Sequence, residues 1–191
     1  MEFQKIQITK QRTLNVTYKS EDGDIVTVTG ANLVHKDLRQ AMNALIPHLA
    51  IITEQREAMG RNLKQVQGDR ITDEGDGSVY KRLDVDTVTF ADGEQDVTVS
   101  GCRILVSTGV IKVQTPVVCL SDGDQYQYND ELSLDLDAVK YEAKQYIEEK
   151  KWGVKQAEID FGDPFEGVKA EDAPVVDMPK KRGRKPKKEV A

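Results

Sequence analysis

The sequence predicts an α+β fold in which antiparallel β-meanders pack with two amphipathic helices, followed by a disordered C-terminal tail. Two kinds of periodicity support this prediction. Apolar residues alternate with a period of two in two stretches, as in half-buried strands, and recur at steps of three and four in two others, as in helices. Both patterns end near residue 156.

The first predicted element is a small β-meander over residues 4–30. The break at Glu21-Asp22-Gly23 suits a short hairpin loop in which glycine takes the left-handed conformation. The alternating apolar residues are Ile6, Ile8, Leu14, Val16, Tyr18, Val26 and Val28.

A helical period follows over residues 36–58. Pro47 lies inside this pattern and lacks a backbone donor, so we expect a kink or two abutting helices. Residues 60–78 are polar and rich in Gly and Asp, and are predicted to form a mobile loop. The apolar stripe of the helical segment comprises Leu38, Met42, Leu45, Leu49 and Ile52, widened by Ala41 and Ile46.

Residues 79–120 predict a second meander. Asp92-Gly93 is typical of a two-residue hairpin turn, which would place Val88 opposite Val97. A further turn near Ser107-Thr108-Gly109 would set Arg103 opposite Val113, Leu105 opposite Ile111 and Val97 opposite Cys119.

This register gives the second meander one apolar face. Cys102 falls on the opposite face from Cys119, so the two thiols are not expected to pair within the sheet. The residues of the apolar face are Val88, Val97, Val99, Leu105, Ile111, Val113, Val117 and Cys119.

Residues 130–152 form the clearest predicted helix, after a third Asp-Gly turn at Asp122-Gly123. Acidic residues crowd its start and lysines its end, which matches the helix dipole. Trp152-Gly153 is the predicted stop, with glycine as the cap. The predicted buried stripe comprises Leu132, Leu136, Val139, Ala143 and Tyr146, with Ile147 beside it.

The 191 residues are enough for one good core, so we expect a single α+β domain over residues 1–155. Residues 156–178 combine acidic residues with prolines and predict a linker that cannot bury enough apolar area to become ordered. Residues 179–191 form the predicted basic disordered tail. No stretch has the length and apolar character of a membrane span or signal peptide, so we expect an intracellular protein, in the cytoplasm or nucleoid or, in a eukaryote, the nucleus.

Residues typical of catalytic and metal sites are scarce. His35 and His48, the two histidines, are expected at the surface or at helix caps. Asp84 and Asp86 would suit paired metal-binding carboxylates of a nuclease, but no matching base or third ligand accompanies them, and solvated strand-face charges explain them better. We therefore expect a protein that is not an enzyme and that has no cofactor and no metal.

The charge distribution is strongly asymmetric. The chain has a net charge of −6, yet residues 180–188 hold seven of its 27 basic residues. The remaining 20 basic and 32 acidic residues outside this segment and Glu189 leave the body near −12. An acidic body repels nucleic acid, whereas a basic tail attracts it.

The basic segment reads Pro179-Lys180-Lys181-Arg182-Gly183-Arg184-Lys185-Pro186-Lys187-Lys188. These ten residues resemble the AT-hook, a short motif that binds the minor groove of A·T-rich DNA. The resemblance implies that Arg182, Gly183 and Arg184 lie along the groove floor, where the negative potential is concentrated. It departs from the family pattern at Lys185, which separates the Arg-Gly-Arg core from Pro186. The flanking lysines Lys180, Lys181, Lys185, Lys187 and Lys188 are expected to meet phosphates.

A run of this kind is also typical of a nuclear localisation signal or of a tail that binds any polyanion. The leading hypothesis is a non-enzymatic, nucleic-acid-associated accessory protein, with a DNA-tethering tail and a body that binds an unidentified protein. The alternative is a structural or inhibitory protein, for example a viral one, whose acidic body repels or mimics DNA while the tail tethers it to a partner.

Overall fold

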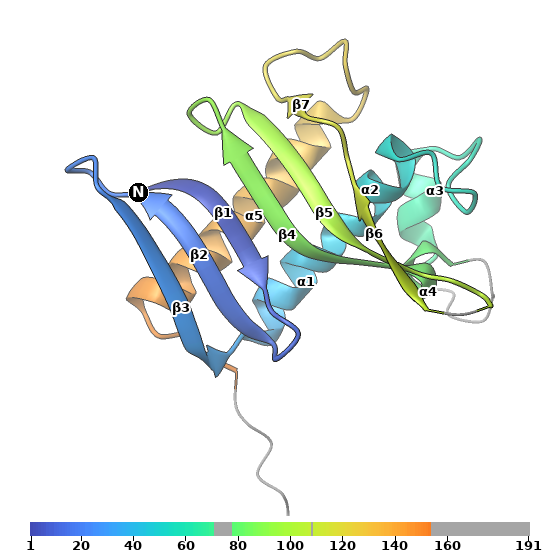
Figure 1. The fold of residues 1–191 in the computed structure, drawn as a ribbon. Helices are drawn as coiled ribbons and strands as arrows, with labels where there is room; N and C mark the ends of the chain where they lie inside the picture. Colours follow the sequence, from blue (N-terminus) through green and yellow to red (C-terminus); the bar gives the residue numbers. More distant parts are fainter. Residues whose placement is uncertain (71–77, 108, 154–191) are drawn as a thin grey trace, which may run out of the picture. The chain divides into compact units, whose positions relative to one another are not determined.

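The computed structural model describes residues 1–70, 78–107 and 109–153. These residues form an antiparallel β-sheet with helices on one of its faces (Figure 1), which confirms the α+β class. The predicted linker over residues 156–178 and the predicted tail over residues 179–191 lie outside the described part of the chain.

The first predicted meander is confirmed. Its strands are β1 (Glu2–Ile8), β2 (Thr13–Lys19) and β3 (Ile25–Leu33), each paired antiparallel with the next. Gly23 lies in the β2–β3 turn with a φ of 91°, the left-handed conformation expected of it. Period-two alternation places Ile6 in the core at 0% exposure.

The second meander contributes β4 (Leu83–Ala91), β5 (Asp96–Ile104), β6 (Val110–Gln114) and β7 (Val118–Cys119). Pairing of β1 with β4 joins the two meanders into one seven-stranded sheet. The strand order is β3-β2-β1-β4-β5-β6, and the short β7 pairs with β5 beyond the end of β6. Strands β3 and β6 therefore lie at the two edges of the sheet.

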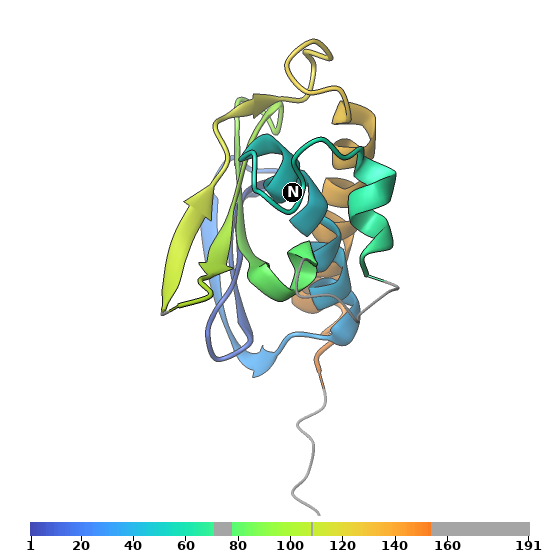
Figure 2. The ribbon, with the colours of Figure 1, turned by 90° about the vertical axis from the view of Figure 1, so that its right-hand side faces the viewer.

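The helical segment divides at Pro47, as predicted. Helix α1 (Lys36–Ala44) ends just before α2 (Ile46–Ile52), and Pro47 occupies one of the first positions of α2, where a missing N–H costs nothing. Together with α5 (Asn129–Glu148) these helices lie against one face of the sheet (Figure 2). The other face carries no helix among the described residues.

Helix α5 presents the predicted stripe to the core, and Leu132, Leu136, Val139, Ala143 and Tyr146 are all buried. Its predicted end at residues 152–153 is wrong. The helix stops at Glu148, and Lys150, not a glycine, takes a positive φ of 57°. The following residues leave the helix because Trp152 pairs with Val34 at the end of β3.

The loop predicted over residues 60–78 is corrected by a short helix, α3 (Leu63–Gly68), and the segment predicted as a meander from residue 79 opens with another, α4 (Val79–Arg82). A capping box opens α3: the Asn62 side chain accepts from the Gln65 N–H, and the Gln65 side chain accepts from the Asn62 N–H. Burial of Leu63 and Val66 then fixes α3 to the core. Residues 71–77 lie outside the description.

The β4–β5 turn is longer than predicted. Val88 pairs with Val99, two positions from the predicted partner Val97. Glu94 is held in this turn because its carboxylate accepts a hydrogen bond from the backbone N–H of Phe3 at 2.6 Å. A shift of two residues changes the partners but leaves each side chain on its predicted face.

The β5–β6 register is also shifted by two residues, since Arg103 pairs with Ile111 in place of Val113. Ile111 keeps its predicted face but is 46% exposed, so its predicted burial is wrong. Strand β6 packs chiefly on β5 and is not covered by a helix. The faces predicted for this hairpin are correct, but the core ends before reaching its outer strand.

The pairing of β7 with β5 is shifted from the predicted register by an odd number of residues, and this overturns two predicted core positions. Val97 pairs with Val118 and not with Cys119. Thr115 donates its N–H to the carbonyl of Val99, and its side-chain oxygen accepts from the N–H of Val99, so the chain bulges after this residue. Val117 is consequently 60% exposed and Cys119 only half-buried.

Both cysteines are free thiols. Cys102 lies on the sheet face away from the helices, opposite Lys112 of β6 and Asp84 of β4. The prediction that the thiols do not pair within the sheet is confirmed.

Candidate interaction surface

The predicted DNA-contacting residues are Lys180, Lys181, Arg182, Gly183, Arg184, Lys185, Lys187 and Lys188, and all of them lie outside the described part of the chain. The DNA site therefore stays a prediction.

His48 is not the surface or cap residue that was predicted. Its side chain is fully buried at the start of α2, where Nδ1 lies 2.9 Å from the Tyr126 hydroxyl and Nε2 lies 3.2 Å from Oδ2 of Asp135. The spacing gave the signal: His48 follows Leu45 by three positions and precedes Ile52 by four, which places it on the apolar stripe.

The Tyr126–His48–Asp135 chain links three separate segments. Burial raises the pKa of Tyr126 well above its usual range, so this phenol stays protonated and can donate. When the Tyr126 hydroxyl donates to Nδ1, Nε2 is the ring nitrogen that faces the Asp135 carboxylate as a donor. Both ring nitrogens of His48 have a partner. This hydrogen-bond network therefore holds the residues before α5 against α2 and is a structural contact.

His35 does cap a helix, as predicted. Its Nδ1 accepts from the backbone N–H of Asp37 at the start of α1, at 3.3 Å. The Asp37 carboxylate in turn lies 2.8 Å from Nζ of Lys151, whose hydrogen bond lowers the pKa of Asp37. This contact holds the chain after α5 against the start of α1.

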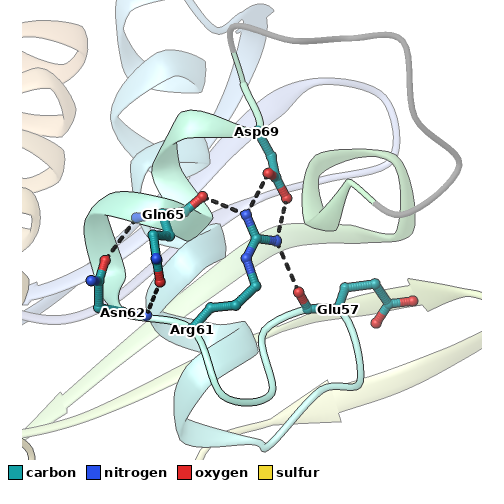
Figure 3. A network of polar contacts seen from close by, with 5 residues as sticks. All are labelled: Glu57, Arg61, Asn62, Gln65 and Asp69. Atoms are coloured by element: carbon teal, nitrogen blue, oxygen red, sulfur yellow. Dashed lines mark hydrogen bonds and ion pairs between the residues drawn. The ribbon is translucent and has the colours of Figure 1, made fainter.

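Arg61 organises the connection between α2 and α3 (Figure 3). It makes a two-point contact with the Asp69 carboxylate, at 2.8 and 2.6 Å, and donates to the backbone carbonyls of Glu57 and Gln65. These hydrogen bonds lower the pKa of Asp69. Both terminal nitrogens of the Arg61 guanidinium thus donate to groups of this chain. Arg61 therefore stabilises a loop and is poorly placed to hold an anionic ligand.

Arg103 fixes the turn end of the β5–β6 hairpin to the same connection. Its guanidinium donates to both carboxylate oxygens of Glu57, at 2.8 and 2.7 Å, and to Oε1 of Gln55 at 2.6 Å. The Glu57 side chain is 13% exposed and that of Arg103 17%, and the contact lowers the pKa of Glu57. Two-point Arg–carboxylate contacts of this kind hold a fixed geometry.

Asp84 and Asp86 lie on β4, as predicted. Asp86 occupies a β-bulge and accepts a hydrogen bond from the Thr87 hydroxyl at 2.6 Å. Partial loss of solvent and the neighbouring Asp86 raise the pKa of Asp84. Partial burial, and then the two aspartates, raise the pKa of the Cys102 thiol. Among the described residues, no three His, Cys, Asp or Glu side chains gather as a metal site would require.

A shallow pocket of about 440 Å³ is lined by residues of α4 and by Ile104 beside the β5–β6 turn. Arg70 lies over the Tyr80 ring at 5.8 Å from its centroid, and Asp84 also lines the pocket. Its walls thus combine positive, negative and apolar groups, which favours no single ligand class.

Four exposed apolar residues lie on the β5–β6 hairpin. We call Ile104, Val106, Val110 and Ile111 the apolar hairpin surface; their exposed fractions are 46%, 83%, 61% and 46%. Ile104 and Val110 are paired on the sheet face away from the helices, whereas Ile111 lies on the helix side, and exposed apolar groups beside an unpaired edge strand are a feature of contact sites. Sequence analysis missed this surface because it assigned Ile111 to the core.

The described residues thus define an α+β protein whose antiparallel sheet ends in an apolar edge. No family model matches the chain. No curated protein matches its sequence, and no solved structure matches it. Within the described ranges, no helix combines the length and apolar character needed to cross a membrane.

Proposed function

We propose that this chain is a non-enzymatic accessory protein, tethered to DNA by its basic tail while its folded body binds another protein. The observation that carries the proposal is the division of charge. Seven basic residues fall within residues 180–188, whereas the rest of the chain is acidic. Because phosphate contacts supply most non-specific affinity for DNA, the tail and not the body is the part suited to it.

The described body supports a role in protein contact. Its buried polar groups, such as His48, and its largely buried ion pair between Arg103 and Glu57 are used in structural contacts. The apolar hairpin surface is left exposed. Tethering would raise the local concentration of a weakly held partner at DNA without any additional contact.

Truncation after Met178 tests the DNA half of the proposal. We expect the full chain to shift duplex DNA in a gel, with an affinity that falls steeply with salt, and the truncated chain not to shift it. The melting temperature should be equal in both, because the apolar core lies within residues 1–153. A matched control keeps the full length but replaces the seven basic residues of 180–188 by glutamine. DNA binding by either variant would overturn the proposal.

Co-purification tests the protein half. A tagged full chain is isolated from its source with and without nuclease treatment. A protein that stays bound after nuclease treatment supports a direct contact with the body, whereas loss of every protein would show that DNA alone connected them.

A further inference from the structure

The outer side of β6 is an open sheet edge. Strand β6 pairs with β5 on one side, and among the described residues no strand pairs with its other side. An unpaired edge presents a row of backbone N–H and C=O groups that another chain can pair with.

The register shows which backbone groups face this edge. The N–H of Leu105 donates to the carbonyl of Gly109, and the N–H of Thr115 donates to that of Val99. Hydrogen-bonded pairs alternate along an antiparallel ladder, so the odd-numbered residues of β6 bond to β5. Val110, Lys112 and Gln114 therefore direct their N–H and C=O groups outward.

The side chains of β6 divide between the two faces of the sheet. Ile111 and Val113 lie opposite Arg103 and Gly101, on the helix side. Lys112 lies on the other face, in a row with Cys102 and Asp84. A strand added to the edge would continue both faces, since directly opposite residues point to the same side.

Charge then restricts what can pair there. Residues 97–120 contain two charged residues, Arg103 and Lys112, and both are basic, in a body that is otherwise strongly acidic. Arg103 is engaged by Glu57. Lys112 is the charged side chain on the pairing strand, so an acidic residue directly opposite it is favoured and a basic one disfavoured.

We infer that the β6 edge binds an extended acidic segment of a partner protein as an additional antiparallel strand. Acidic side chains of the partner lie on the Lys112 face, and apolar ones alternate with them on the face of Ile111 and Val113. This inference rests on the proposed protein-binding role of the body and names the partner's chemistry. A second copy of this chain fits less well, because pairing of β6 with itself over its full length places Lys112 opposite Lys112.

Peptide binding to the full chain tests the inference. The probe is a short fluorescent peptide in which glutamate alternates with valine, and the control peptide has lysine in place of glutamate. We expect anisotropy to show binding of the acidic peptide and not of the basic one. Amide hydrogen exchange should show new protection at Val110, Lys112 and Gln114, with no change at Ile111 or Val113, which already bond to β5.

Variants at one position separate charge from backbone pairing. Lys112→Gln keeps the outward N–H and should weaken the acidic peptide about two- to five-fold, the range of a cross-strand charge pair. Lys112→Pro also removes that N–H and should weaken it further, by about another two- to ten-fold. Proline is tolerated on an edge strand whose N–H faces solvent, and a thermal melt checks that the variant is folded. Lys112→Glu should reverse the preference between the two peptides.

Three results would overturn the inference. One is failure of both peptides to protect the outward amides. Another is dimerisation of the free protein with protection of those amides, which would assign the edge to a second copy. A third is protection of the same amides by duplex DNA in place of the peptide. Because the chain truncated after Met178 keeps β6, its peptide binding is independent of the tail, so failure here and failure of the DNA tether give distinguishable results.

Discussion

At the scale of single residues, His48 shows how a polar side chain becomes a core residue. It lies among apolar neighbours of α2 and is fully buried, which is acceptable because Tyr126 and Asp135 satisfy its two nitrogens. The cost of disturbing such a group comes mainly from the partner that is left unsatisfied. The Tyr126 hydroxyl, held in a largely buried side chain, is that partner.

The buried hydrogen bond between His48 and Tyr126 predicts that substitutions at the two positions have strongly coupled effects on stability. His48→Leu should lower the free energy of unfolding by about 1–3 kcal/mol, because the Tyr126 hydroxyl loses its acceptor. In the His48→Leu, Tyr126→Phe double variant we expect a smaller loss than the sum of the two single losses. Urea unfolding of the four proteins gives the coupling energy. Additive losses would show that the hydrogen bond contributes nothing specific.

At the scale of elements, α3 depends on polar contacts as much as on its apolar side chains. It has six residues, too few to be stable alone. Arg61, which precedes the helix, donates to the Gln65 carbonyl within it and to the Asp69 carboxylate at its end. The Asp69 carboxylate is the anionic end of this contact. Protonation of Asp69 should therefore loosen the region between α2 and α4.

The contact predicts a loss of stability in acid with a definite sign. The hydrogen bonds from Arg61 lower the pKa of Asp69 in the fold, so the unfolded chain binds this proton more tightly. The stabilisation is complete above the usual aspartate pKa of about 4 and is lost as the pH falls through the lowered value. We expect Asp69→Asn to cost about 1 kcal/mol near pH 7, because both groups reach solvent, and much less near pH 2. Urea unfolding at the two pH values measures this, and an equal cost at both would refute the assignment.

Helix α5 contributes five buried hydrophobic side chains to the core on the helical side of the sheet. Leu136 is 1% exposed in the middle of its buried stripe. Leu136→Ala should lower the free energy of unfolding by about 2–5 kcal/mol, from lost transfer energy and the cavity left behind. Leu134→Ala is the matched control, since Leu134 is 70% exposed on the same helix and should change stability by no more than about 0.5 kcal/mol. Equal effects would mean that α5 does not pack as described.

At the scale of the whole molecule, the proposed function depends on the separation of charge between body and tail. If the tail binds any polyanion, replacing Arg182 and Arg184 by lysine keeps its charge and should leave DNA affinity nearly unchanged. If it binds as an AT-hook, the same change should weaken A·T-rich duplexes far more than G·C-rich ones. Lysine is the more strongly hydrated of the two cations and is harder to desolvate in a narrow groove.

We expect an intermediate result, with a weak A·T preference added to a strong salt-dependent term, because Lys185 interrupts the motif. The slope of log affinity against log salt should be no steeper than about −6, from seven basic residues. Anisotropy titrations on matched A·T-rich and G·C-rich duplexes at several salt concentrations measure both quantities. Equal losses on the two duplexes would leave charge alone as the basis of binding.

The class of fold and most elements could be predicted from the sequence, because they follow from local periodicity. The spacing of Leu132, Leu136 and Val139 predicted the buried face of α5, and Pro47 predicted the break between α1 and α2. The capping box of Asn62 and Gln65 is a local sequence signal of the same kind, although it lies within the predicted loop over residues 60–78. Each of these signals depends on neighbouring residues and on the geometry of one helix turn or one strand.

Which apolar residues lie in the core depends instead on contacts between distant segments. Glu94 lengthened one turn by binding the N–H of Phe3, and the bulge after Thr115 exposed Val117. Strand β6 kept its predicted face yet left Ile111 at the surface, because alternation specifies a side and says nothing about what covers it. The spacing of His48 places it on the apolar stripe, but its partners Tyr126 and Asp135 come from distant segments, which no local pattern encodes. The open edge beside Lys112 likewise depends on contacts between segments far apart in the chain.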